Sequence, residues 1–245
     1  MTEEIRLNSS KLGTKEYWNQ FYQVEKKNFE TNEDDTGECW FDDSDAESKM
    51  ISFIIDKLND QEFPFHDEQI KFLDLGTGNG HLLFQLNEDL EEEYDGSEKF
   101  IFTGIDYSPD SVEFAANIAK RKYEDIEFKF EQSDLLKSND PFIIKGIKYN
   151  ILLDKGTLDA IALNQDPIEE FNGKIGMEVY ASQIERLMNK DSVLLITSCN
   201  FTESELITII ENNSNLKVWD KINYPSFEFG GIKGSTVCSI AFTIQ

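Results

Sequence analysis

Apolar residues follow two different periods along this chain, and the change between them falls near residue 70. Before it, the aromatic and apolar residues of 17–24 recur at spacings of one, three and four, which predicts an amphipathic helix. A second helix is expected over 50–58, with Ser44 or Asp45 near its N-cap. The segment 31–41 between them is acidic and turn-rich. These 69 residues form no strand pattern, so we interpret them as an extension.

From residue 70 onward, short apolar runs alternate with helical patterns, which predicts right-handed βαβ units and a mostly parallel sheet. The expected strands are 70–75, 100–105, 126–130, 149–153 and 192–197, followed by 216–222 and 236–244. The expected helices are 80–90, 109–122, 157–163, 176–189 and 202–212. The acidic stretches 87–99 and 164–170 are interpreted as solvated loops.

The last two strands have only a loop between them, so they should pair antiparallel. The predicted fold class is α/β, a seven-stranded Rossmann-like sheet with five parallel strands, a C-terminal antiparallel strand pair and helices on both faces. Residues 1–69 are expected to pack on this sheet and cap its binding site. Residues 70–245 are expected to form the main domain as one structural unit.

Composition narrows the classes of protein. The N-terminus lacks the basic and apolar regions of a secretory signal, and no stretch reaches the ~20 apolar residues of a membrane span. Three cysteines and two histidines are too few for a structural zinc site and indicate a reducing compartment, so we expect a cytoplasmic protein without a metal.

The net charge is strongly negative, because 23 basic residues oppose 48 acidic ones, giving −25. Such a surface repels phosphate backbones, and no local basic patch offsets it, so direct nucleic-acid binding is not expected. The charge suits a basic protein partner, or it serves only to keep the protein soluble.

A glycine-rich turn carries the main functional signal. The first predicted strand reaches Asp74, and Gly76, Gly78 and Gly80 then lead into a helix. Glycine allows positive φ and lets a ligand lie against the backbone. A strand, such a turn and a helix form a nucleotide cradle at the carboxyl edge of a sheet.

Two other nucleotide ligands of such a turn, a dinucleotide and a nucleoside triphosphate, are disfavoured by its sequence. The dinucleotide motif GxGxxG would need a third glycine where His81 stands, and the expected ribose acid comes late, at Asp106. The turn also lacks the lysine of a phosphate-binding P-loop. The GxGxG form is typical of S-adenosylmethionine enzymes, so S-adenosyl-L-methionine is the expected cofactor.

Residues after the next two strands fit an adenosyl ligand. Asp106 ends the second strand, where an ionised carboxylate can accept both ribose hydroxyls, and Tyr107 is placed to lie along the adenine. After the third strand, Asp134 could accept the adenine amino group, with Leu135 packing on the ring. Taken alone, Asp134 is equally a helix N-cap.

The fourth strand ends at the same sheet edge with Asp154 and Lys155, which are expected next to the methyl donor. Methyltransferases of base amino groups carry an Asn- or Asp-Pro-Pro-aromatic motif here, and this chain has Asp-Lys-Gly-Thr157 instead. That departure argues against a nucleic-acid amine as the methyl acceptor.

Seven blocks, in this order, closely resemble the small lysine methyltransferases of translation elongation factor 1-alpha, especially the fungal members. They are Leu12-Gly-Thr-Lys-Glu-Tyr-Trp18, Asp35-Thr-Gly-Glu-Cys-Trp-Phe41, Leu73-Asp-Leu-Gly-Thr-Gly-Asn-Gly80, Gly104-Ile-Asp-Tyr-Ser108, Leu153-Asp-Lys-Gly-Thr-Leu-Asp-Ala160, Ile196-Thr-Ser-Cys-Asn200 and Phe227-Glu-Phe-Gly-Gly231. The second, fifth and sixth blocks are the most particular to the family. The stretch 87–99 is longer than usual.

The resemblance implies a class I methyltransferase domain, with elongation factor 1-alpha as protein substrate. It implies that the cofactor is surrounded by Gly76, Gly78, Asp106, Tyr107, Asp134, Leu135 and Trp40. Asp74 and Asp154 are expected to contact the cofactor because of their places at the ends of the first and fourth strands. Trp40 would close the site, or it is a core tryptophan beside the sheet. The acceptor channel is expected to involve Tyr17, Trp18, Lys155 and Thr157.

A lysine amine must be neutral to attack a sulfonium methyl group, so aromatic walls that disfavour its cation are expected, with Asp154 orienting the amine. Three alternatives remain open. They are a methyltransferase of RNA or a small-molecule amine, a non-catalytic binding module that keeps the cofactor fold, and an NAD-dependent oxidoreductase. The intact glycine turn disfavours the second, and His81 disfavours the third.

Overall fold

The predicted alternation of strands and helices is present in the computed structural model, which describes residues 5–41, 44–225, 227–229, 232–234 and 236–245. The main sheet has the strand order β3-β2-β1-β4-β5-β9-β6. Its strands are β1 (Gln69–Leu75), β2 (Lys99–Asp106), β3 (Phe128–Gln132), β4 (Tyr149–Lys155), β5 (Met188–Ser198), β6 (Leu216–Ile222) and β9 (Cys238–Ile244). Strands β1 to β5 pair in parallel, and β9 runs antiparallel to β5 and β6. The predicted fold class is confirmed.

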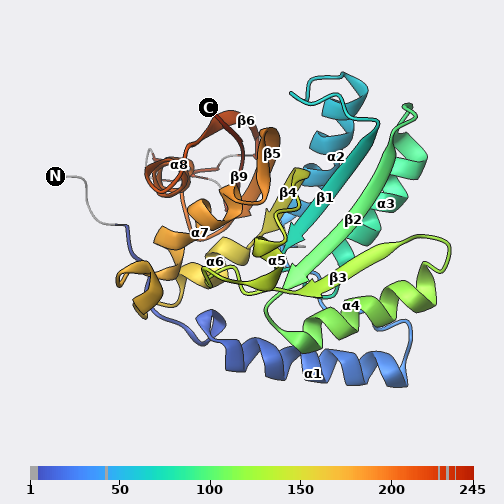
Figure 1. The fold of residues 1–245 in the computed structure, drawn as a ribbon, viewed down its shortest axis with the longest axis horizontal. Helices are drawn as coiled ribbons and strands as arrows, with labels where there is room; N and C mark the ends of the chain where they lie inside the picture. The colour runs from blue at the N-terminus through green and yellow to red at the C-terminus, as the bar shows by residue number, and fades with distance from the viewer. Residues whose placement is uncertain (1–4, 42–43, 226, 230–231, 235) are drawn as a thin grey trace.

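Helices cover both faces of this sheet (Figure 1). They are α1 (Lys15–Thr31), α2 (Ala46–Asn59), α3 (His81–Glu93), α4 (Pro109–Lys122), α5 (Pro141–Ile144), α6 (Thr157–Ala162), α7 (Gly176–Glu185) and α8 (Glu203–Asn212), with short 3-10 turns η1 (Lys11–Gly13) and η3 (Glu169–Phe171). None of them, within the described part of the chain, combines the length and the apolar character needed to cross a bilayer.

The two faces follow from residue alternation within the strands. In β1, Phe72 packs with α2 and α3, whereas the next residue, Leu73, packs with α5 to α8. Val193 and Leu194 of β5 divide in the same way. Helix α1 lies along α4 at the outside (Figure 1), where Phe29 and Phe114 are both buried and their ring centroids lie 5.8 Å apart. Within the N-terminal extension, α1 therefore packs on the sheet domain through α4, whereas α2 packs on the sheet itself.

Several boundaries differ from the sequence expectations, and three of the differences have a clear structural basis. The stretch 87–99, expected as a loop, is helical to Glu93, because a leucine stripe ending at Leu90 is buried against the core. The helix expected over 176–189 ends at Glu185, since Met188 pairs with Tyr149 and begins β5. The loop before β9 contains a small hairpin, β7 (Phe227–Phe229) and β8 (Ile232–Gly234). Gly230 and Gly231, which end the last family block, lie outside the described residues.

Candidate active site

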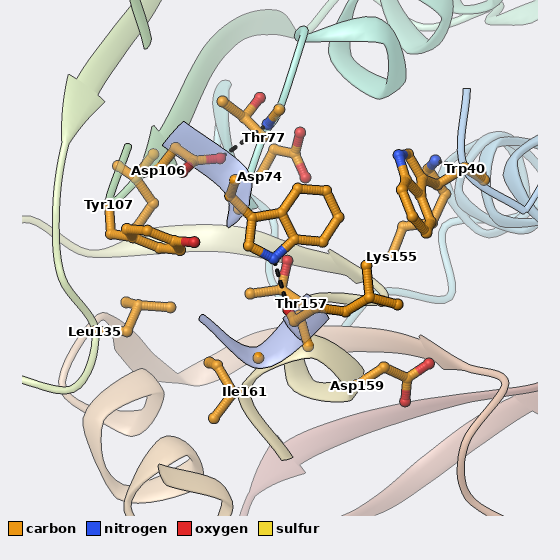
Figure 2. Close-up of a pocket in the computed structure, with 18 of the residues that line it drawn as sticks. Trp40, Asp74, Thr77, Asp106, Tyr107, Leu135, Lys155, Thr157, Asp159 and Ile161 are labelled. Carbon is orange, nitrogen blue, oxygen red and sulfur yellow. Dashed lines mark hydrogen bonds between the residues drawn. The ribbon is translucent and has the colours of Figure 1, made fainter. Parts of the chain in front are cut away.

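A cavity of about 310 Å³ lies where the strand order reverses, at the carboxyl ends of β1, β2 and β4. This switch point is where ligands bind in open α/β sheets. Figure 2 shows Asp106, Tyr107 and Leu135 on one side of the cavity, and Trp40 and Lys155 on the other. The first group follows β2 and β3, so we call this the adenosine side. We call the second the strap side, after the segment 36–41 that carries Trp40.

The glycine turn has the conformation that its sequence predicts. Gly76, Gly78 and Gly80 have φ of 68°, 58° and 83°, the left-handed region that side chains disfavour. A Cβ atom at Gly76 would lie 2.2 Å from Oγ1 of Thr157, and one at Gly78 would lie 2.6 Å from the Tyr22 hydroxyl. These glycines are therefore required by their dihedral angles and also by close packing of the protein's own side chains.

Asp106 is buried at the end of β2 and lines the cavity. One carboxylate oxygen accepts the Gly78 N–H at 3.2 Å, and the other accepts the Ser108 N–H at 2.9 Å. Burial raises the pKa of this carboxyl, although these hydrogen bonds act against the shift. The residue thus couples the glycine turn to the next strand and leaves lone pairs on both oxygens for a ligand.

The other residues predicted for the adenosyl group also meet at this side. Leu135 is buried, and Tyr107 and Asp134 line the cavity with it. The ammonium group of Lys15 binds the Asp134 carboxylate and lies 5.3 Å from the centre of the Tyr107 ring. Helix α1 is thereby fastened to the adenosine side, a contact that the sequence analysis did not anticipate.

Asp74 lies deeper in the cavity wall, beneath the glycine turn. It is 3% exposed, and burial raises the pKa of its carboxyl to about 7, with the charge of Lys155 acting against the shift. A carboxyl group with such a pKa can accept or donate a hydrogen bond near neutral pH, which suits a contact with an ammonium or amide group of a ligand.

The strap closes the opposite side of the cavity. The Trp40 ring packs against Trp18 with 5.1 Å between ring centroids, and both rings line the cavity. Lys155 donates to the Trp40 carbonyl at 2.7 Å and forms an ion pair at 3.2 Å with the buried Glu47 of α2. Burial acts to raise the pKa of Glu47, but His81 and Lys155 outweigh it and lower the pKa. Lys155 therefore holds the strap to the end of β4.

Two of the predicted residues do not reach the cavity. Asp154 is 0% exposed, and its carboxylate accepts the Tyr180 hydroxyl at 2.5 Å and the Thr157 and Leu158 N–H groups at the start of α6. Burial raises its pKa to about 7. Asp154 is therefore not among the residues that line the cavity, and its position gives no support to the predictions that it contacts the cofactor and orients the amine. Tyr17 also lies outside the cavity lining, packed edge-on against Trp18.

Sequence reasoning missed several residues of the cavity wall. Asp159, in the first turn of α6, accepts the Cys199 N–H at 2.8 Å and the hydroxyl of Ser198, and burial raises its pKa. Cys199 and Asn200 follow β5 and also line the cavity. Their place after a parallel strand was a usable signal, because all such strand ends meet at one edge of the sheet.

The cavity fits S-adenosylmethionine in its chemistry. Its volume lies at the lower end of the range of roughly 300–1,000 Å³ for small-molecule sites. Asp106 offers two acceptors for a diol, Leu135 an apolar face and Asp134 an acceptor for an amino group. On the strap side, Nε1 of Trp40 is buried without a hydrogen-bond partner among the described residues, so a polar group is available there as well.

Comparison with known proteins agrees with this chemistry. A family model described as "Methyltransferase domain" matches residues 66–231. The chain is 48% identical to "Protein-lysine N-methyltransferase EFM4" of Saccharomyces cerevisiae, with 98% of this chain and 97% of that protein covered. It is 38% identical to the protein of the same name in Schizosaccharomyces pombe, over 98% and 96%. It is 32% identical to human "EEF1A lysine methyltransferase 2", over 95% and 86%.

Solved structures share the fold at low sequence identity. A TehB-like SAM-dependent methyltransferase from Corynebacterium glutamicum superposes with a TM-score of 0.55 at 14% identity, covering 93% of this chain and 98% of that one. An S-adenosylmethionine-dependent methyltransferase from Clostridium acetobutylicum gives 0.54 at 11% identity, over 93% and 98%. Together with the full-length relatives, these findings show that the chain belongs to the S-adenosylmethionine-dependent protein-lysine N-methyltransferases.

Proposed function

We propose that this enzyme methylates a lysine of translation elongation factor 1-alpha. The observation that carries the proposal is full-length similarity: relatives from mouse, human and zebrafish that are named EEF1A lysine methyltransferase 2 align over 95% of this chain. The net charge of −25 supports a basic protein as substrate, because opposite charge speeds encounter between proteins. In the basic run at the end of α4, Arg121 and Lys122 pair with Glu33 and Asp34, which argues against binding of a phosphate backbone and so against RNA.

The two sides of the cavity have different roles in the proposed reaction. When bound, S-adenosylmethionine supplies a methyl group already activated on a sulfonium. Asp106 and Leu135 hold the adenosyl part by the contacts that their chemistry allows, and correct placement then supplies most of the acceleration. We assign Asp154 an indirect role. It caps α6 and so positions Thr157 and Asp159 at the cavity wall.

The acceptor amine must lose its proton before attack, since its reference pKa is ~10.4. Trp18, Trp40 and Phe41 line the strap side of the cavity. We propose that these rings surround the incoming lysine, lower its pKa by disfavouring the cation, and present π faces to the methylated ammonium product.

We further propose that residues 1–69 act as the cap of this site and that the protein works in the cytoplasm. Five of the residues that line the cavity, from Leu12 to Tyr22, belong to η1 or α1. Cys39 and Cys238 are free thiols, which is consistent with a reducing compartment.

The proposal is tested with labelled S-adenosylmethionine and an extract from cells that lack the enzyme. We expect label in one protein of the size of elongation factor 1-alpha, and mass spectrometry of that protein should locate a single methylated lysine. Asp106→Ala protein is the matched negative control. Label that enters RNA or a small-molecule fraction, with none in the elongation factor, would overturn the substrate assignment while leaving the methyltransferase intact.

A further inference from the structure

Three metal-ligating side chains meet behind the strap, where the proposed function does not use them. Cys39 comes from the strap, Glu47 from α2 and His81 from the first position of α3. The cysteine Sγ lies 3.5 Å from a Glu47 oxygen and 3.8 Å from Nδ1 of His81, and that nitrogen lies 2.6 Å from the other Glu47 oxygen. Within the described part of the chain, this group has its three donor atoms within 4.8 Å of one another.

The donor set matches one class of cation. Sulfur, imidazole nitrogen and carboxylate oxygen are the three ligand types of Zn²⁺, which takes four ligands in a tetrahedron. Metal–ligand bonds of about 2.0–2.3 Å place tetrahedral donor atoms roughly 3.3–3.6 Å apart. Two of the three separations here, 3.5 and 3.8 Å, are already close to that spacing. The 2.6 Å hydrogen bond of His81 is made to the other Glu47 oxygen, so this hydrogen bond must open for the imidazole and the oxygen near Cys39 to meet one ion.

Neighbouring polar groups hydrogen-bond to these residues and hold them in orientation, as they do around bound metals. Glu47 is 8% exposed, and its oxygen that faces away from His81 is bound by Lys155. The His81 backbone N–H donates to the side chain of Asn79 at 3.2 Å, and Asn79 in turn donates to the strap carbonyl of Thr36 at 3.0 Å. The Lys155 cation lowers the affinity of Glu47 for a metal, so we expect a site of moderate affinity.

We propose that Cys39, Glu47 and His81 bind one Zn²⁺ ion, with water as the fourth ligand. The Cys39 thiol and the protonated His81 ring each give up one proton to solvent on binding, because thiolate and neutral imidazole are the forms that ligate zinc. The ion ties the strap to α2 and to the helix that begins directly after the glycine turn. Zinc thereby fixes the strap that carries Trp40. The sequence analysis expected no metal because it counted only cysteines and histidines. It could not foresee that a buried glutamate would lie beside one of each.

The test measures zinc binding itself, by calorimetry with ZnCl2 on protein first treated with a chelator. Wild type should bind one equivalent. His81→Gln and Cys39→Ser should bind at least tenfold more weakly. The chain has only two histidines, and His66 is exposed on the surface, so His66→Gln is a matched control that should bind like wild type. Circular dichroism checks that each variant is folded.

Cobalt gives a second readout that misfolding cannot imitate. Co²⁺ added to wild type should produce tetrahedral d–d bands and a thiolate-to-cobalt charge-transfer band, and Cys39→Ser should lose the charge-transfer band. Absence of zinc binding by wild type, or equal binding by wild type and both ligand variants, would overturn the proposal. Because neither assay uses methyl transfer, the result is independent of the substrate assignment.

Discussion

The ends of β2 and β4 place two buried aspartates at the same edge of one sheet, yet only one faces the ligand cavity. Asp106 ends β2 and lines the cavity, and it accepts hydrogen bonds from N–H groups of the glycine turn and of Ser108. The side chain of Asp154, in β4, points into the protein. There it accepts hydrogen bonds from the Tyr180 hydroxyl and from the first N–H groups of α6. A strand-end acid is therefore not enough to identify a ligand contact.

The N-cap of the helix after each strand decides between the two outcomes. After Asp106, the helix α4 has its own N-cap, since the Ser108 side chain accepts the Ser111 N–H. After β4, the N-cap of α6 is Gly156, which has φ of 87° and no side chain to offer. The unsatisfied N–H groups of α6 therefore bind Asp154 instead. Asp106 is left free for a ligand because a neighbour supplies the cap.

The largest effect should come from Asp154→Ala. This change leaves the buried Tyr180 hydroxyl and the α6 N–H groups without their acceptor, and we expect a loss of about 3 kcal/mol of unfolding free energy. Thermal denaturation should then show a Tm lower by roughly 6–12 °C. Asp154→Asn keeps an oxygen acceptor and should restore much of the loss. A stable Asp154→Ala protein with normal cofactor affinity and no turnover would instead support the earlier prediction that Asp154 orients the amine.

Asp106→Ala should weaken cofactor binding. Loss of hydrogen bonds to a charged acceptor costs about 1.5–3 kcal/mol, which corresponds to roughly 10- to 150-fold in the dissociation constant for S-adenosylmethionine. Isothermal titration calorimetry measures it. Asp110→Asn is the control, because Asp110 pairs with Lys26 outside the cavity and should bind like wild type. An unchanged dissociation constant in Asp106→Ala would remove the distinction between the two strand ends.

A smaller effect is expected from Lys155→Met. Because Lys155 binds the Trp40 carbonyl and Glu47, its loss should loosen the strap and raise the KM for S-adenosylmethionine about tenfold, with a smaller change in kcat. Tryptophan fluorescence should shift on cofactor binding in wild type and less in the variant, and Lys155→Arg should rescue in part. An unchanged KM with a large fall in kcat would support the substrate-channel role that the sequence predicted.

The smallest effect is a pH dependence on the strap side. Contacts with Cys39 and Glu47 raise the pKa of His81 to about 10, above the ordinary 6.5. The folded protein thus holds a proton that the unfolded chain releases. The stabilisation is full below pH 6.5 and is lost as the pH rises through 10. In chelator-treated protein, the stability difference between wild type and His81→Gln should shrink over that interval. A midpoint near pH 7 in an NMR titration of His81 would contradict this prediction.

The sequence by itself determined the fold, and it placed Asp106, Tyr107 and Leu135 after strand ends that meet at one cavity. Strand alternation and the glycine turn are local signals, because dihedral angles and residue periodicity act over a few residues. The antiparallel pairing of the last two strands could also be predicted, because the segment between them has no helical pattern. The helical state of residues 87–93 was missed because an acidic composition concealed the buried leucine stripe.

The side-chain contacts around the strap and β4 were decided only by the tertiary structure. Asp154 is directed inward because α6 needs a cap, Lys155 meets Glu47 across 108 positions of the chain, and Cys39 meets His81 across 42. Such contacts depend on how α2, α3 and β4 pack together, and no local pattern specifies them. Burial then changes the chemistry of these groups, because low exposure removes the water that would otherwise solvate each charge.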